Sequence, residues 1–256
     1  MLSFGTKGVE YPVSKIEELC NGKIKLFGMA SGAGPLIDEF FVKLKRSCSE
    51  AKVSSVEVAA QEALNLYQRM LSEHIEHQVL RPWGLRIGDL ASGKRVEEQL
   101  LQGILVAGSQ VLEGFRSNLF PIIGGIDSEG TKIFEVSNGA IDYLTKLGFA
   151  VTGSGKESAE WTLIHNNFDP NSHLYRSLVL GLLAKFQAEE SMGVGTNTDV
   201  RVVTTRTDGN ETLSDKAIKT VRGLIQKEQK RQQNRLENII SRIKYKQLLQ
   251  GSENEA

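Results

Sequence analysis

Cysteine is scarce in this chain of 256 residues, which contains only Cys20 and Cys48. Two cysteines form one bridge at most, so a disulfide framework is excluded and two reduced thiols are the simpler expectation. No hydrophobic run approaches the ~20 residues that would span a bilayer. Residues 1–10 also lack the basic and apolar regions of a secretory signal. We therefore expect a cytoplasmic protein without a membrane partner.

An excess of charge of one sign is also missing, since the chain has 31 basic and 31 acidic side chains. Hydrophobic residues make up 40% and charged residues 24%, which excludes wholesale disorder and fibrous rods. The balance hides an asymmetry: residues 215–249 contain ten basic and three acidic side chains, a net +7, which leaves −7 on the rest. A near-neutral body with a basic tail does not by itself indicate a nucleic-acid-binding domain.

The basic tail is predicted to be one long helix over residues 214–250. Its apolar positions cluster at the two ends, and residues 226–235 between them contain none. We interpret the segment as a helix that docks at both ends and has a solvated middle. The alternative is a surface for a partner or for nucleic acid.

Hydrophobic periodicity in the rest of the chain predicts a mixed α+β fold. A strand over 23–30 leads through a turn to Pro35, which suits the start of a helix, and Ser54 or Ser55 can cap a second helix. Consecutive helix pairs favour helices layered on a mostly antiparallel sheet. The other predicted elements are a loop over 81–93, a helix over 96–115, a β-hairpin over 119–136, a strand over 148–152, helices over 156–166 and 172–190, and a strand over 199–204.

Two motifs resemble parts of known binding sites, but each lacks residues that such a site needs. Residues 153–156 read Gly-Ser-Gly-Lys, but Ala150 and Glu157 stand where a phosphate loop needs Gly and Ser or Thr. A tight strand-to-helix turn and an anion site at the helix start both remain possible there. His74 and His77 lie one helical turn apart with no third ligand nearby. We therefore expect neither a metal nor a cofactor.

Four sequence blocks stand out when they are taken in order. They are YPVSKI at 11–16 followed by FGMASG at 27–32, the helix pair at 35–78, PIIGGIDSEG at 121–130, and GFAVTGSGKESA at 148–159. Together these blocks resemble proteasome-type subunits of the N-terminal nucleophile hydrolases. The last block is the most specific, because it is similar to the family's strand, Gly-Ser-Gly turn and helix. Residues 193–195 resemble the entry to the family's last strand, and the likeness covers roughly residues 2–205.

The resemblance implies a fold and an assembly. The fold would be α+β, a four-layer αββα sandwich, here followed by the long C-terminal helix. Its partners would be copies of itself or related subunits in stacked rings, with a peptide or protein as substrate, and nucleic acid is not expected. The domains would be a proteasome-like domain over 1–205, with an insertion over about 81–117, and a basic helical extension over 206–256.

The resemblance also implies roles for four residues. In active members, the hydroxyl of an N-terminal Thr attacks the scissile carbonyl, and its own amine acts as the base. Lys15 stands where a lysine lowers the pKa of that amine through like-charge repulsion. Ser154 matches the serine that contacts the amine. Ser31 or Gly32 matches the residue whose N–H forms the oxyanion hole, and the alignment allows either.

The chain departs from the family pattern at its beginning. In the family, two strands that start at the nucleophile precede the Lys-Ile block, whereas fourteen residues precede Lys15 here. The nucleophilic Thr therefore has no counterpart in this sequence. Either the sequence is recorded from an internal Met or the protein is a non-catalytic ring subunit. Two lost central strands would expose sheet edges, which favours the first explanation. A hydrolase of small amides is a further alternative.

Overall fold

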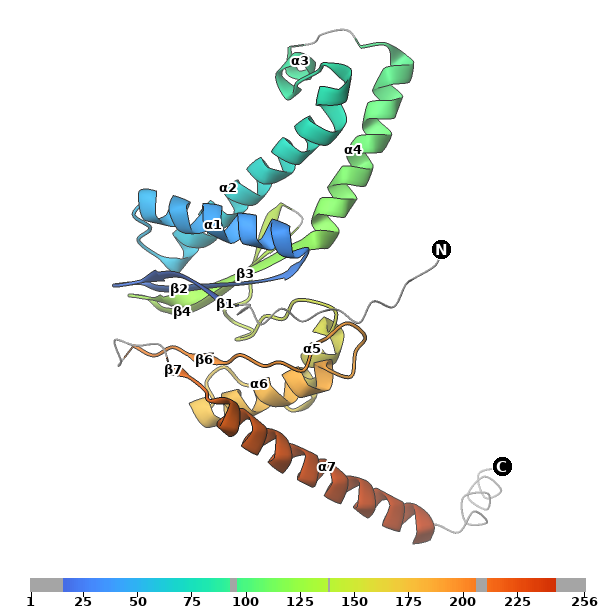
Figure 1. The fold of residues 1–256 in the computed structure, drawn as a ribbon. Helices are drawn as coiled ribbons and strands as arrows, with labels where there is room; N and C mark the ends of the chain where they lie inside the picture. The colour runs from blue at the N-terminus through green and yellow to red at the C-terminus, as the bar shows by residue number, and fades with distance from the viewer. Residues whose placement is uncertain (1–15, 93–95, 138, 206–210, 243–256) are drawn as a thin grey trace, which may run out of the picture.

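The computed structural model describes residues 16–92, 96–137, 139–205 and 211–242. Two helices cover one face of an antiparallel sheet, and a second group of helices lies beyond its other face (Figure 1). The sheet has the strand order β1-β2-β3-β4-β5. Its strands are β1 (Ile16–Asn21), β2 (Lys25–Gly32), β3 (Leu119–Asp127), β4 (Gly130–Ser137) and β5 (Ala140–Tyr143).

The helix layer on the sheet consists of α1 (Gly34–Glu50) and α2 (Val56–Ile75). Pro35 lies in the first turn of α1, and the Ser55 side chain accepts a hydrogen bond from the backbone N–H of Val58 at 3.2 Å. Both predicted helix starts are thus confirmed, with Ser55 as the cap of α2. The main core lies between these helices and the sheet, and its fully buried side chains include Phe40, Leu44, Met70, Ile123, Phe134 and Val136.

The two faces of the sheet differ in chemistry. Phe134 and Val136 on β4 belong to the core under the helices, whereas Glu135 between them points to the other face. Ile122 pairs with Glu135 across the strands and with Met29 on its other side, so all three share that far face. The far face therefore combines apolar side chains with a carboxylate.

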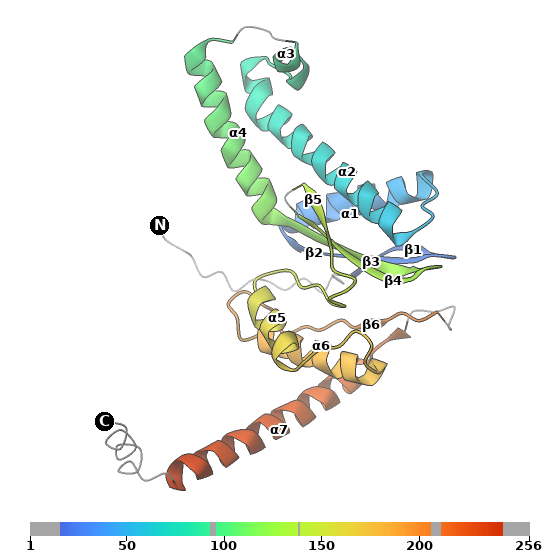
Figure 2. The same ribbon diagram turned by 180° about the vertical axis from the view of Figure 1, so that it is seen from behind.

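Helix α2 continues through a π-helical turn η1 (Glu76–Leu80) into a helical arm that rises away from the sheet (Figures 1 and 2). The arm also contains a 3₁₀ turn η2 (Arg81–Trp83), α3 (Ile87–Ala91) and α4 (Glu98–Asn118). A separate cluster of Val79, Leu80, Leu85 and Ile104 holds its tip together. The prediction of a loop over 81–93 is wrong, because the backbone there forms two short helices.

Beyond the far face of the sheet lie α5 (Lys156–His165), α6 (Leu174–Ala188) and the two-stranded sheet of β6 (Arg201–Val202) with β7 (Glu211–Thr212). Among the described residues, this two-stranded sheet is all that stands in the place of a second large sheet. The helix-and-sheet architecture is thus confirmed, whereas the four-layer sandwich is not.

The predicted strand over 148–152 is wrong. Gly148 has a φ of +80°, which extended strands do not use, and a Cβ there would lie 2.4 Å from Cβ of Pro170. The segment instead turns and approaches the sheet through a side chain, since Thr152 Oγ1 donates a hydrogen bond to the carbonyl of Phe120 at 3.3 Å. The predicted strand over 199–204 is reduced to the two residues of β6.

The long C-terminal helix is α7 (Asp215–Arg242), and it leaves the body below α6 (Figure 1). Ile218 is buried, but Leu236, Ile239 and Ile240 are exposed. The expectation that both ends dock is therefore wrong for the described part of the distal end, because α7 has already run past the body there. Residues 243–250 of the predicted helix lie outside the described residues. No helix among the described residues is long and apolar enough to cross a membrane.

A buried carboxylate joins the β3–β4 hairpin to the start of α2. Asp127 accepts hydrogen bonds from the backbone N–H of Val56 at 3.0 Å and of Glu129 at 2.9 Å, and it lies 3.5 Å from the Lys132 ammonium. Burial raises the pKa of Asp127, but the two N–H donors and the ammonium outweigh it, so the pKa lies below its usual value. The charged form therefore stabilises the folded state.

We predict that Asp127→Asn lowers the free energy of unfolding by about 1–2 kcal/mol at neutral pH, because the substitution removes the charge that receives two backbone donors. The lowered pKa means that this contribution is present above the ordinary Asp pKa and is lost as the pH falls through the folded value. Urea unfolding should thus show a difference from wild type that is constant above about pH 5 and shrinks as the pH falls further, through the folded pKa of Asp127.

The matched control is Asp142→Asn, which changes an exposed carboxylate on the neighbouring strand β5 and should alter stability little. An Asp127→Asn difference that stays constant as the pH falls below about 5 would contradict the role of the charge.

Candidate functional site

The end of β2 meets the Gly-Ser-Gly turn that precedes α5. Ser31 Oγ lies 2.6 Å from Thr152 Oγ1, and the two form a hydrogen bond across 121 positions of sequence. A Cβ placed on Gly153 would lie 3.4 Å from Cβ of Ser31, which is ordinary contact. Two segments that the sequence analysis assigned to one site therefore touch. Helix α5 begins directly after the turn, and the N–H of its first residue, Lys156, donates to the carbonyl of Gly153 at 3.0 Å.

Position 32, the second oxyanion-hole candidate, requires a glycine because of its backbone conformation and its close neighbour. Its φ is +130°, a region that residues with a Cβ rarely adopt, and a Cβ would lie 2.0 Å from the carbonyl oxygen of Asn118. That carbonyl also accepts a hydrogen bond from the N–H of Ala33 at 2.9 Å. The last residue of β2 is thus clamped against the start of β3, which fixes the position of the Ser31–Gly32 backbone.

Ser154, the candidate amine contact, is exposed beside this junction. A Cβ on Gly193 would lie 3.7 Å from Ser154 Oγ, so residue 193 borders the same place. The structure thus brings Ser154 to the neighbourhood of Ser31 and Gly32, and none of the three roles is tested by it. Lys15 lies outside the described residues.

An ion pair next to the turn was missed by the sequence analysis. Lys156 Nζ lies 3.2 Å from both carboxylate oxygens of Glu135 and 3.8 Å from Glu160. The sequence analysis considered Lys156 only as the lysine of an incomplete phosphate loop. The alternating pattern of residues 131–136 did place a carboxylate opposite the apolar face, but nothing in the sequence tied it to α5. This pair fastens the start of α5 to the far face of the sheet.

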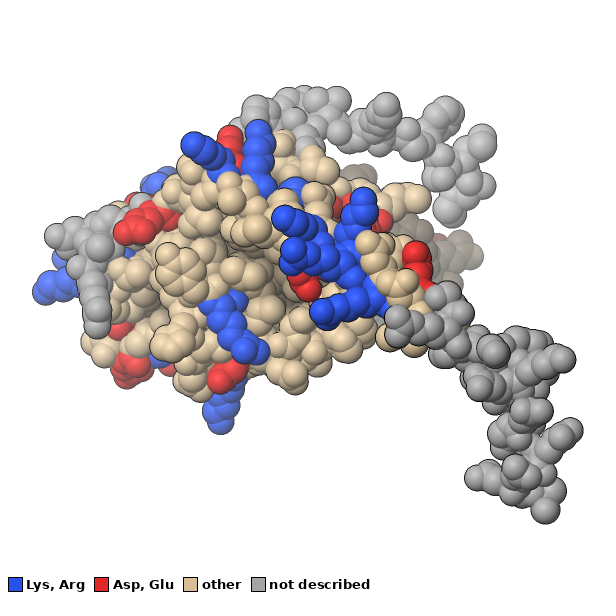
Figure 3. All heavy atoms as spheres, turned by 90° about the horizontal axis from the view of Figure 1, so that it is seen from below, with Lys and Arg blue, Asp and Glu red and all other residues tan. Residues whose placement is uncertain are grey.

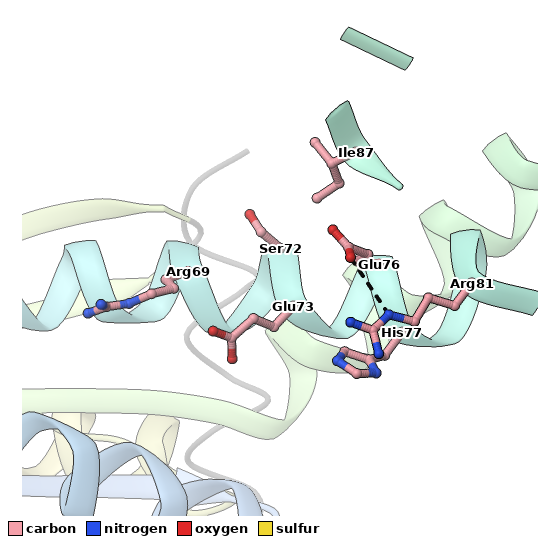
Figure 4. A pocket seen from close by; sticks show the side chains of 7 residues that line it. All are labelled: Arg69, Ser72, Glu73, Glu76, His77, Arg81 and Ile87. Atoms are coloured by element: carbon pink, nitrogen blue, oxygen red, sulfur yellow. Dashed lines mark ion pairs between the residues drawn. The ribbon is translucent and has the colours of Figure 1, made fainter. Parts of the chain in front are cut away.

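A hollow of about 190 Å³ lies elsewhere, on the outer side of α2 and beside α3 (Figure 4). Two ion pairs involve its lining: Arg81 lies 3.7 Å from Glu76, and Glu73 lies 3.3 Å from Lys43. Within the described ranges, no cluster of three or more His, Cys, Asp or Glu side chains could hold a metal ion.

The sequence matches no protein-family model and no curated protein sequence. The structure is similar to that of Anbu (ancestral beta-subunit) from Yersinia bercovieri, with a TM-score of 0.58 and 14% sequence identity. The match covers 91% of this chain and 86% of that chain. At this identity the similarity concerns the fold alone. It supports a proteasome-like fold, which is the coarse form of what the sequence blocks implied.

We predict that Gly32→Ala lowers the free energy of unfolding by about 3 kcal/mol or more, because a positive φ and an overlap with a backbone carbonyl must both be relieved. Gly34→Ala is the matched control: it lies two residues on, at the start of α1, and a Cβ there meets nothing within 4 Å. Urea midpoints measure both. Equal midpoints for the two variants would show that the clamp on Gly32 does not hold in solution.

Proposed function

We propose that the protein is a proteasome-type subunit whose reactive site lies where the end of β2 meets the Gly-Ser-Gly turn. The observation that carries the proposal is the hydrogen bond of Ser31 with Thr152, the residue directly before the Gly-Ser-Gly turn. Segments that the family resemblance assigned to one site on motif alone are neighbours in space. The fold similarity to a protein described as an ancestral beta-subunit supports the same proposal.

The proposed chemistry is hydrolysis of an amide bond in a peptide. A Thr hydroxyl attacks the carbonyl carbon, and its own amine takes the hydroxyl proton. The C–N bond then breaks, the amine passes that proton to the leaving amine, and an ester with the Thr remains. Water, which gives a proton to the same amine, attacks the ester, releases the acid product and restores the Thr hydroxyl. A backbone N–H of Ser31 or Gly32 would stabilise the oxyanion, and the clamp on Gly32 holds this backbone in place before reaction. Ser154 would orient the amine, and Lys15 would keep it neutral by like-charge repulsion.

A ring subunit without activity is the second candidate. Ser31 Oγ is engaged by Thr152, and Thr152 in turn donates to the carbonyl of Phe120, so these hydroxyls also have a purely structural use. A hydrolase of small amides would share the nucleophile but not the rings. Native mass separates this last alternative from a ring subunit.

We expect ring contacts on the α1–α2 layer, and these contacts can use only side chains that the core leaves exposed. Phe40, Leu66 and Met70 are buried in the core, so they are not available to a partner. Val42 on α1 and Val58 on α2 are exposed and point outward. An interface on this layer would therefore use the outward side chains.

The test compares the 256-residue form with a form extended by the in-frame coding sequence that precedes Met1, where that sequence encodes a Thr. We predict that only the extended form cleaves fluorogenic peptides and is blocked by a threonine-directed inhibitor. Lys15→Ala in the extended form should lower turnover by about 100-fold or more, because a protonated amine is a poor base. Inhibitor-sensitive cleavage by the 256-residue form would contradict the proposed nucleophile.

Ser154→Ala should also lower turnover in the extended form. Its matched control is Ser158→Ala, one turn further along α5, where the hydroxyl pairs with Ser191 at 3.2 Å instead. Equal turnover in these two variants would remove Ser154 from the site and leave a fold resemblance only.

A further inference from the structure

The base of α7 is fixed to the end of α6 by a half-buried arginine. Arg222 donates to both carboxylate oxygens of Glu189, at 2.5 and 2.9 Å, and its guanidinium lies 3.9 Å from the centre of the Phe186 ring. Burial raises the pKa of Glu189, but the hydrogen bonds from Arg222 and Lys185 outweigh burial. The pKa therefore lies below its usual value, and the carboxylate is charged at neutral pH. One face of α6 thus receives one face of α7.

Both faces continue along their helices at the same three- and four-residue spacing. On α6, the face that ends in Phe186 and Glu189 includes the buried Leu182 and, before it, Val179 and Tyr175. On α7, the face that contains Arg222 begins at the buried Ile218 and continues after the polar stretch. Its later apolar members are Leu236, Ile239 and Ile240.

Only one half of each face is covered. At the start of α6, Tyr175 is 83% exposed and Val179 39% exposed. On α7, Leu236 is 57% exposed and Ile240 59% exposed, and both views show this end running away from every other labelled element (Figures 1 and 2). The α7 of the same chain therefore leaves the start of α6 uncovered, and its own distal half meets nothing.

We propose that the distal half of α7 docks on a second copy of this chain, against the uncovered start of α6. The proposed contact extends the α6–α7 interface that exists within one chain. It uses the same faces of the two helices and the same residue spacing. Because the two surfaces differ, the contact is head-to-tail, and repetition closes a ring or extends a filament.

The charge distribution favours docking of α7 on the body of a second copy over the packing of two α7 helices on each other. Residues 215–249 carry +7 and residues 1–214 carry −5, so the basic helix of one copy is attracted to the body of another. Lys and Arg side chains gather over the side of the molecule on which α7 lies (Figure 3). Two α7 helices packed on each other would bring like charges together. Lys227 and Lys230 lie away from the apolar face, where they face solvent when that face is buried.

The test is a cross-link between two differently tagged full-length chains, both with Cys20→Ser. One chain carries Tyr175→Cys and the other Ile240→Cys, and a short bismaleimide is added to the mixture. We expect a product that contains both tags. Replacing Ile240→Cys by Leu224→Cys, which is 64% exposed on α7 but off this face, should reduce that product at least about tenfold. Equal yields from the two positions would overturn the proposal.

Sedimentation of the full chain gives a second measurement. Leu236→Glu should weaken self-association at least about tenfold, whereas Leu224→Glu on the same helix should leave it unchanged. If both variants associate like wild type, the proposal is wrong. Binding of the chain to phosphatidylserine vesicles that is lost in Leu236→Glu, without the mixed cross-link, would assign the face to lipid and also overturn it. Neither readout uses turnover, so its outcome is independent of the proposed hydrolysis.

Discussion

The two faces of the five-stranded sheet contact their neighbours in different ways, and the arrangement of the other elements depends on this difference. One face is closed by α1 and α2 over a continuous apolar core. The other face meets its neighbours through separate polar contacts. These are Ser31 with Thr152, Glu135 with Lys156, and Lys25 Nζ, which donates to the carbonyl of Thr204 at 2.8 Å. Directional contacts of this kind fix positions rather than fill space, which suits a site more than a core.

Periodicity and turn chemistry predicted the helix layer and the central hairpin well. Pro35, Ser55 and the turn before Gly130 are local features that act through the backbone of their own segment, so one sequence suffices to find them. Helix α4 was also predicted, although three glycines weaken its local preference. The edge strands β1 and β5 were missed, because short edge strands have little pattern of their own.

The site was predicted in outline and not in its contacts. Motif order placed Ser31, Gly32 and Ser154 together, and the structure brings them to one junction. The contact through Thr152 and the pair of Lys156 with Glu135 could not be foreseen, because they depend on how two distant segments approach each other. Gly148 shows the reverse error: an apolar run indicated a strand, but its positive φ turns the chain.

The central claim is that the junction of β2 with the Gly-Ser-Gly turn holds the reacting carbonyl. The direct test is a crystal structure with a covalent peptide inhibitor, determined on a form extended by in-frame upstream sequence that encodes a Thr. The account predicts that the inhibitor oxygen lies within hydrogen-bond distance of a backbone N–H of Ser31 or Gly32, with Ser154 beside the attached amine. An inhibitor bound elsewhere, or one whose oxygen faces away from the end of β2, would contradict it.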